Sequence, residues 1–104
     1  MKPYRIDFES MEWESPADGV RFKAFERNSR KLRLVEFTKE FVEPDWCIKG
    51  HIGYILEGQI EIDFNGEKEI FDPGDGVFIP AGGEHKHKGR VVTEKVTAIL
   101  VEEA

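Results

Sequence analysis

The dipeptide Asn65-Gly66 separates two segments in which apolar and polar side chains alternate. In the first of them, Gln59 to Phe64, every second residue is apolar. Such a period of two places successive side chains on opposite faces of a β-strand. Asn-Gly between two alternating segments is typical of the type I′ turn of a tight hairpin. The sequence therefore predicts an antiparallel hairpin with strands at Gln59–Phe64 and Glu67–Phe71.

Similar short segments, separated by turn residues, recur along the chain. Besides the hairpin, we expect strands at Lys2–Phe8, Val20–Glu26, Leu32–Thr38, Cys47–Leu56, Val77–Ile79, His85–Gly89 and Val91–Val101. The abundance of Val, Ile and Phe favours strands, and no window has a helical period of useful length. Connections this short cannot make parallel crossovers. The sequence therefore predicts an all-β sandwich or barrel with antiparallel pairing.

A length of 104 residues corresponds to one domain. We expect residues 1–19 to form an N-terminal edge strand and connector, and residues 20–101 to form the barrel. The formal net charge of −6 argues against binding to a nucleic-acid backbone, which requires clustered Lys and Arg. The basic cluster at Arg27, Arg30, Lys31 and Arg33 is better interpreted as a solvated turn than as an anion-binding patch.

No segment approaches the ~18 consecutive apolar residues of a membrane span. The first twenty residues include the acidic residues Asp7, Glu9, Glu12 and Glu14 and no apolar run, so we expect no signal peptide. The single cysteine, Cys47, excludes an intrachain disulfide framework. We therefore expect a cytoplasmic protein without a membrane or nucleic-acid partner.

Side chains with metal-binding atoms gather in two of the expected strands. In a regular strand, residues two or four apart point to the same side. If both strands face the barrel interior, the donor side chains that converge there are Asp45, Cys47, His51, His85 and His87. Imidazole, thiolate and carboxylate together suit a divalent transition metal, and open coordination positions would make the site catalytic. His51, His85, Cys47 and Asp45 are the candidate ligands, with His87 and Lys49 as pocket residues.

Each of these residues also has a structural interpretation. A single buried Cys47 is usually an inert small hydrophobe. His87, flanked by two lysines, would point outward if a bulge intervened. Lys49 fits a solvated or ion-paired position better than a catalytic one. The polar residues would then line a barrel mouth that binds only water.

The segment from Gly74 to His85 resembles the second conserved motif of the cupins, in which glycine, proline, glycine and a metal-binding histidine stand at these spacings. The segment Asp45–Gly58 resembles the first cupin motif, with Gly58 as its final glycine. The resemblance covers roughly Arg33 to Val101. It implies a double-stranded β-helix, which is a small jelly-roll barrel, commonly as a homodimer.

The resemblance also implies iron, manganese, nickel, copper or zinc, held by three histidines and a glutamate. The residues that match those positions are Asp45, Cys47, His51 and His85. His51 in place of glutamate keeps a ligand. The exchange of two histidines for Asp45 and Cys47 has three possible outcomes: the metal site is kept, it binds a different metal, or it is lost. The sequence is therefore compatible with a metal-bound protein and with a metal-free one.

Three functions are compatible with this pocket. The first is a metal-dependent enzyme of oxygenase or isomerase type that acts on a small organic substrate. The second is a non-catalytic module that binds or senses a small ligand such as a sugar or an organic acid. The third is a thiol-based role for Cys47. The many aromatic residues, which include Tyr54 and Phe78, exceed what a barrel core of ~100 residues hides and favour a homodimer.

Overall fold

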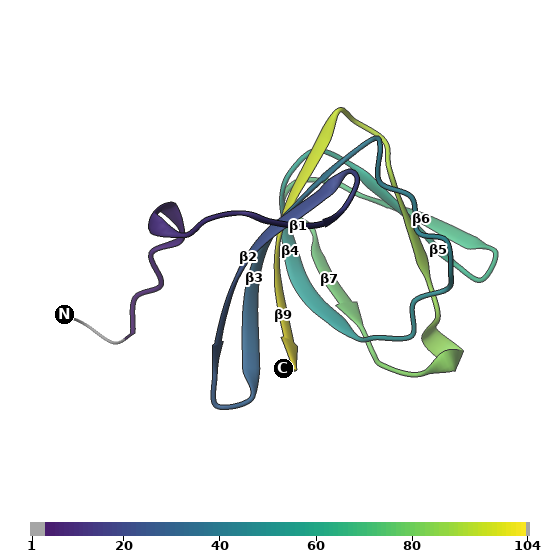
Figure 1. The fold of residues 1–104 in the computed structure, drawn as a ribbon. Coiled ribbons are helices and arrows are strands. Elements are labelled where there is room, and N and C mark those ends of the chain that lie inside the picture. The colour runs from purple at the N-terminus through teal and green to yellow at the C-terminus, as the bar shows by residue number, and fades with distance from the viewer. Residues whose placement is uncertain (1–3, 104) are drawn as a thin grey trace.

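The computed structural model describes residues 4–103, which form short strands and two 3₁₀ turns (Figure 1). The elements are η1 (Phe8–Ser10), β1 (Glu14–Ala17), β2 (Val20–Arg27), β3 (Arg30–Thr38), β4 (His51–Glu57), β5 (Ile60–Phe64), β6 (Glu67–Phe71), β7 (Gly76–Ile79), η2 (Gly83–His85), β8 (Lys88–Val91) and β9 (Lys95–Glu103). Neither helical element of the described residues has the length or apolar character that a membrane crossing needs.

Within residues 4–103 the strands form a six-stranded sheet, β1-β2-β3-β9-β4-β7, and a three-stranded sheet, β6-β5-β8. Every strand pairing is antiparallel. In Figure 1, β5 and β6 lie across the barrel from β9 and β4. This confirms the predicted all-β fold, an antiparallel jelly-roll barrel.

The hairpin predicted at Asn65-Gly66 joins β5 to β6, with Phe64 opposite Glu67. Both turn residues have positive φ, 58° for Asn65 and 109° for Gly66, as a type I′ turn requires. The backbone N–H of Gly66 donates to the carboxylate of Asp63 at 2.7 Å. The local sequence therefore sets the register of the smaller sheet.

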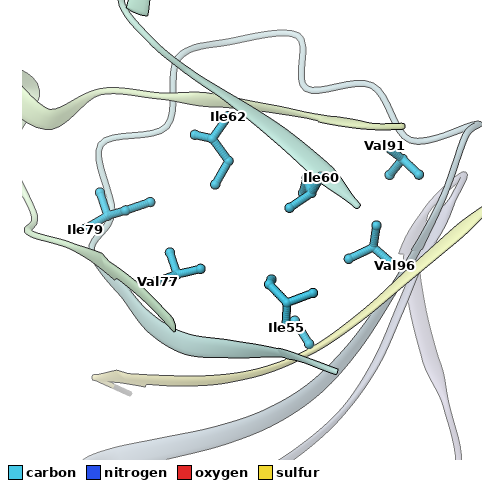
Figure 2. Close-up of a cluster of buried hydrophobic side chains, with 8 residues drawn as sticks. Ile55, Ile60, Ile62, Val77, Ile79, Val91 and Val96 are labelled. Atoms are coloured by element: carbon cyan, nitrogen blue, oxygen red, sulfur yellow. The ribbon is translucent and has the colours of Figure 1, made fainter. Parts of the chain in front are cut away.

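Apolar side chains from both sheets meet inside the barrel. The buried cluster is Ile55, Ile60, Ile62, Val77, Ile79, Val91, Val96 and Ala98. Figure 2 shows the side chains of β5 and β8 pointing toward those of β4, β7 and β9. Alternation along each strand explains this set, because every second residue faces inward.

The edge strand expected at Lys2–Phe8 is not found in the described part of that segment. Lys2 lies outside the described residues, and no strand forms between Tyr4 and Phe8. The edge of β2 is instead paired with β1. The carbonyl oxygen of Phe8 accepts from the Lys23 ammonium at 2.7 Å and from the N–H of Met11 in the η1 turn.

The strands expected at Cys47–Leu56 and His85–Gly89 both begin later than predicted. β4 begins at His51 and β8 at Lys88. Before them, the two segments meet in one isolated bridge between Cys47 and His87. The assumption of regular strands, which placed alternate residues on one side, therefore fails in both segments.

Candidate functional site

Cys47, His51 and His87 bring three metal-binding side chains together inside the barrel. Their ligand atoms all lie within 4.8 Å of one another. The sulfur of Cys47 is 3.7 Å from Nε2 of His51. The two imidazole rings are nearly perpendicular, with centroids 5.3 Å apart. A cluster of this size matches the spread of ligands around one metal ion.

The backbone holds two of these residues side by side. The N–H of Cys47 donates to the carbonyl of His87 at 2.8 Å, and the N–H of His87 donates to the carbonyl of Cys47 at 3.0 Å. His51 begins β4, four residues after Cys47. The site is therefore built where the loop before β4 crosses the segment before β8.

His51 is oriented by a carboxylate on the last strand. Its Nδ1 lies 2.8 Å from Oε2 of Glu102. Arg33 on β3 donates to both oxygens of the same carboxylate, from Nε and Nη2, each at 2.7 Å. Because a carboxylate accepts hydrogen bonds, His51 donates from Nδ1, and the lone pair of Nε2 is left toward Cys47.

Glu102 is held in its charged form. Burial alone would raise its pKa, but the hydrogen bonds from His51 and Arg33, together with the charges of Arg33 and of His51, outweigh burial and lower the pKa from 4.5 to about 2. A charged carboxylate behind an imidazole raises the basicity of the other ring nitrogen and fixes the ring orientation. Glu102 therefore holds the ring of His51 in the way that a carboxylate holds a metal-binding histidine.

His87 is oriented in the same way by the backbone. Its side chain is buried, with 4% of the residue exposed, and its Nδ1 lies 3.1 Å from the carbonyl oxygen of His85. A carbonyl only accepts, so Nδ1 donates and Nε2 keeps its lone pair. In the neutral ring, these contacts through Nδ1 leave Nε2 of both histidines as the nitrogen that can bind a metal.

The cluster lines a cavity of about 260 Å³ that extends along the hydrophobic core. The cavity is lined by Val20, Arg33, Phe37, Phe41, Glu43, Cys47, His51, Ile55, Ile60, Ile62, Val77, Ile79, His87, Gly89, Val96, Ala98 and Leu100. Most of these side chains are apolar. The site thus combines a few polar groups with a largely aliphatic wall, as is typical of small-molecule pockets.

Three residues predicted for the site lie outside the cluster and outside the cavity lining. Asp45 and Lys49 are exposed on the irregular segment before β4. His85 ends the η2 turn with 42% of its side chain exposed, 3.9 Å from the carboxylate of Glu84. His85 therefore does not share the hollow with His51. His87, which was expected only as a pocket residue, lies beside Cys47 and His51 where His85 was expected.

Sequence analysis missed Arg33, Glu43 and Glu102. Glu102 and Arg33 each continue an inward-facing row of apolar residues, after Leu100 on β9 and before Val35 on β3. A charged residue at an inward position of a strand was the signal, because buried charges occur only with partners. Glu43 lies on the loop before β4, where no periodicity could place it.

The donor set fits a transition metal. A thiolate and two imidazoles suit zinc, copper and iron. Three protein ligands leave one position open for water or substrate, as in catalytic sites. The carboxylate and the carbonyl that hold the two imidazoles are the outer partners that ligating histidines normally have.

A family comparison matches residues 48–101 to the cupin domain. These residues are more than half of the chain, so the protein belongs to the cupin domain family. No curated protein matches the sequence.

Solved structures agree with this fold. KdgF from Halomonas sp. shares 24% identity over 92% of this chain and 91% of its own, with a TM-score of 0.72. An RmlC-like cupin from Shewanella frigidimarina NCIMB 400 shares 17% identity over 98% and 91%, with a TM-score of 0.74. The polyketide cyclase RemF from Streptomyces resistomycificus shares 20% identity over 99% and 79%, with a TM-score of 0.78. At these identities the likeness is one of fold.

Proposed function

We propose that the protein is a metal-dependent enzyme that acts on a small organic substrate inside the barrel. The ligands are Cys47, His51 and His87, and zinc, copper and iron are the ions that this donor set suits best. The observation that carries the proposal is that both imidazoles are held through Nδ1, in a cluster whose ligand atoms lie within 4.8 Å of one another and in which Nε2 of His51 is 3.7 Å from the thiol.

The chain's own residues have separable tasks in this mechanism. A bound metal supplies Lewis acidity toward a substrate oxygen. Arg33 and Glu102 keep His51 in one tautomer and one orientation. The aliphatic wall excludes water, which strengthens electrostatic interactions at the cluster. An oxygenase or an isomerase would each use these features.

The test is metal analysis of untagged protein. We expect about one equivalent of a transition metal per chain, and loss of that metal in Cys47→Ser and His87→Ala variants that still fold. Protein that is metal-free as purified and takes up no added iron, manganese, nickel, copper or zinc would contradict the proposal.

A second candidate is thiol chemistry at Cys47. Glu102, His51 and Cys47 follow one another as carboxylate, imidazole and thiol, with contacts of 2.8 Å and 3.7 Å. This is the order found in nucleophilic sites in which a base activates a thiol. Alkylation of chelated protein by iodoacetamide separates the two candidates. Thiol chemistry predicts faster alkylation of Cys47 in the wild type than in His51→Ala, and equal rates would count against it.

We also propose that the protein is a homodimer that associates through the outer face of the six-stranded sheet. Apolar residues stand opposite one another in two neighbouring rows on this face. The first row runs Phe25, Leu32, Val101, Ile52 and Phe78 across five strands. The second row contains Leu34, Ile99 and Tyr54. Val101, Ile52, Tyr54 and Phe78 are between 38% and 74% exposed.

Charged residues flank the two rows along the strands, one group beyond the first row and one beyond the second. Interfaces commonly have such an apolar core and polar rim. Arg27, Arg30 and Glu103 form one border, and Arg21 and Glu36 lie at the other. A second copy, turned end for end, would bring Arg27 and Arg30 near the acidic Glu36. Trp13 of the same chain covers only the β2 end, where it lies over Arg21 and Lys23.

A cytoplasmic location completes the proposal. It is supported by the free thiol of Cys47 at the centre of the site, because a reducing compartment keeps such a thiol available to a metal. Fractionation of the producing cells tests it.

A further inference from the structure

We infer that the ligand of this pocket has a compact apolar body, the size of one substituted ring, and carries its polar groups on one side only. One polar group meets the Cys47, His51 and His87 cluster. The other is a hydrogen-bond donor that meets the carboxylate of Glu43. The first contact rests on the function proposed above, and the apolar body and the Glu43 contact do not.

The aliphatic wall of the cavity offers a ligand no hydrogen bonds from side chains. Ile55, Ile60, Ile62, Val77 and Val96 are buried core residues and line the cavity at the same time. A ligand hydroxyl placed against them would lose its water without gaining a partner. That loss weakens binding by about tenfold for each group. A polyol such as a sugar would incur this cost several times over.

Many of the polar groups at the cavity already make hydrogen bonds within the protein. Arg33 donates two of its five N–H groups to Glu102. Both histidines use Nδ1 within the protein. In the described part of the chain, the groups left for a ligand are therefore the three donor atoms of the cluster, one oxygen of Glu43 and the N–H groups of Arg33 that Glu102 does not use.

Glu43 reaches the barrel interior from the loop before β4. Its Oε1 accepts the backbone N–H of Gly89 at 2.8 Å. A Cβ added to Gly89 would lie 3.4 Å from that oxygen and 3.3 Å from Cδ1 of the core residue Ile60. The carboxylate therefore lies beside the aliphatic wall, with one oxygen held by Gly89 and the other available.

Glu43 and the cluster lie within the span of one small molecule. Gly89 follows His87 by two residues, which corresponds to about 6.6 Å along a strand, and both residues line the cavity. An apolar cavity of about 150 Å³ accepts benzene. The cavity of about 260 Å³ seen here accommodates one ring with substituents.

The experiment uses phenol, the three dihydroxybenzene isomers and myo-inositol as probes, with binding measured by calorimetry. Each probe is titrated into wild-type protein, Glu43→Gln and a matched control, Glu40→Gln, which changes an exposed carboxylate on the same loop. Glutamine at position 43 can still accept from Gly89 through its amide oxygen. The substitution removes the charge and replaces the second oxygen, which a ligand donor would meet, with an NH₂ group that only donates.

We expect the best dihydroxybenzene to bind wild type at least tenfold more tightly than myo-inositol. Glu43→Gln should weaken that isomer about tenfold, leave phenol within twofold, and Glu40→Gln should change neither. Tighter binding of myo-inositol, or equal effects of Glu43→Gln on phenol and the dihydroxybenzenes, would overturn the inference. All titrations are repeated on chelated protein. If the cluster binds no metal, the preference for a ring and the Glu43 effect should still appear there, so the two proposals fail separately.

Discussion

His51 and Glu102 are 51 residues apart in sequence, yet Nδ1 of the imidazole and Oε2 of the carboxylate are 2.8 Å apart. The contact exists because β9 lies between β3 and β4 in the larger sheet. It brings the end of the last strand beside the first residue of β4. The orientation of one candidate ligand therefore depends on the closing strand of the barrel.

Replacement of this carboxylate tests its supporting role. Glu102→Gln removes the charge that holds the Nδ1 proton of His51, and we expect metal affinity to fall by about 10- to 100-fold. A competition titration against a chromophoric chelator measures the change. Glu103→Gln, at the exposed neighbouring position, is the control and should keep wild-type affinity. Equal affinities for both variants would show that Glu102 does not act on the site.

The same carboxylate predicts how stability depends on pH. The pKa of Glu102 is about 2 in the folded protein and returns to its ordinary value on unfolding. Between these two pKa values the unfolded chain binds more protons, so the free energy of unfolding decreases as pH falls from about 4.5 to 2. Above about pH 4.5 this contribution is fully present. Urea denaturation of chelated protein at several pH values measures it, and Glu102→Gln should have a flatter profile over this window. An unchanged profile in the variant would be inconsistent with the low pKa.

Local sequence signals predicted most of the fold. Alternation and the Asn65-Gly66 turn predicted β5 and β6 with their register, and alternation placed β2 and β3 within a few residues. An N-terminal edge strand does form, but it is β1 (Glu14–Ala17) in the segment expected as connector, and no strand forms between Tyr4 and Phe8. Which segment occupies an edge is decided by competition between distant segments, and a local pattern does not contain that information.

The site was predicted less completely than the fold. Cys47 and His51 come together as expected, because they flank the entry to one strand. His85 and His87 were expected on the same side, but the η2 turn ends at His85 and changes the direction of the chain. Glu102 lies so far along the sequence that only the pairing order of the strands could place it beside His51.

Position 58 should tolerate only glycine, because the backbone of another segment lies close to it. Gly58 has φ +79°, and an added Cβ would collide with the carbonyl oxygen of Lys95 and lie 2.8 Å from Oγ1 of Thr93. Gly58→Ala should therefore lower the free energy of unfolding by more than about 2 kcal/mol. Gly66, which has φ +109° but open space around it, is the matched control. Gly66→Ala should cost about 1 kcal/mol from backbone strain alone. Equal losses in urea denaturation would mean that the contact with Lys95 contributes nothing.

The apolar outer face predicts the oligomeric state. Phe78 is 74% exposed at the β7 end of the first apolar row of the proposed interface, so Phe78→Asp should separate the dimer while the barrel stays folded. Light scattering after size exclusion should give twice the 12.0 kDa chain mass for wild type and a single chain mass for the variant. Ile70→Asp, at a 49% exposed position on β6 of the other sheet, should remain dimeric. A monomeric wild type, or a dimer that survives Phe78→Asp, would contradict the proposed interface.

The ligand set predicted from the sequence contains His85, whereas the cluster in the structure contains His87. His87 is buried and lies beside Cys47 and His51, whereas His85 is partly exposed and contacts Glu84. His87→Ala should reduce metal affinity at least 100-fold, since it removes one of three ligands. His85→Ala should change affinity less than twofold, because His85 contributes only its backbone carbonyl to the orientation of His87. Circular dichroism confirms folding of both variants before metal titration. The opposite order of effects would return His85 to the ligand set and would mean that the η2 turn rearranges when metal binds.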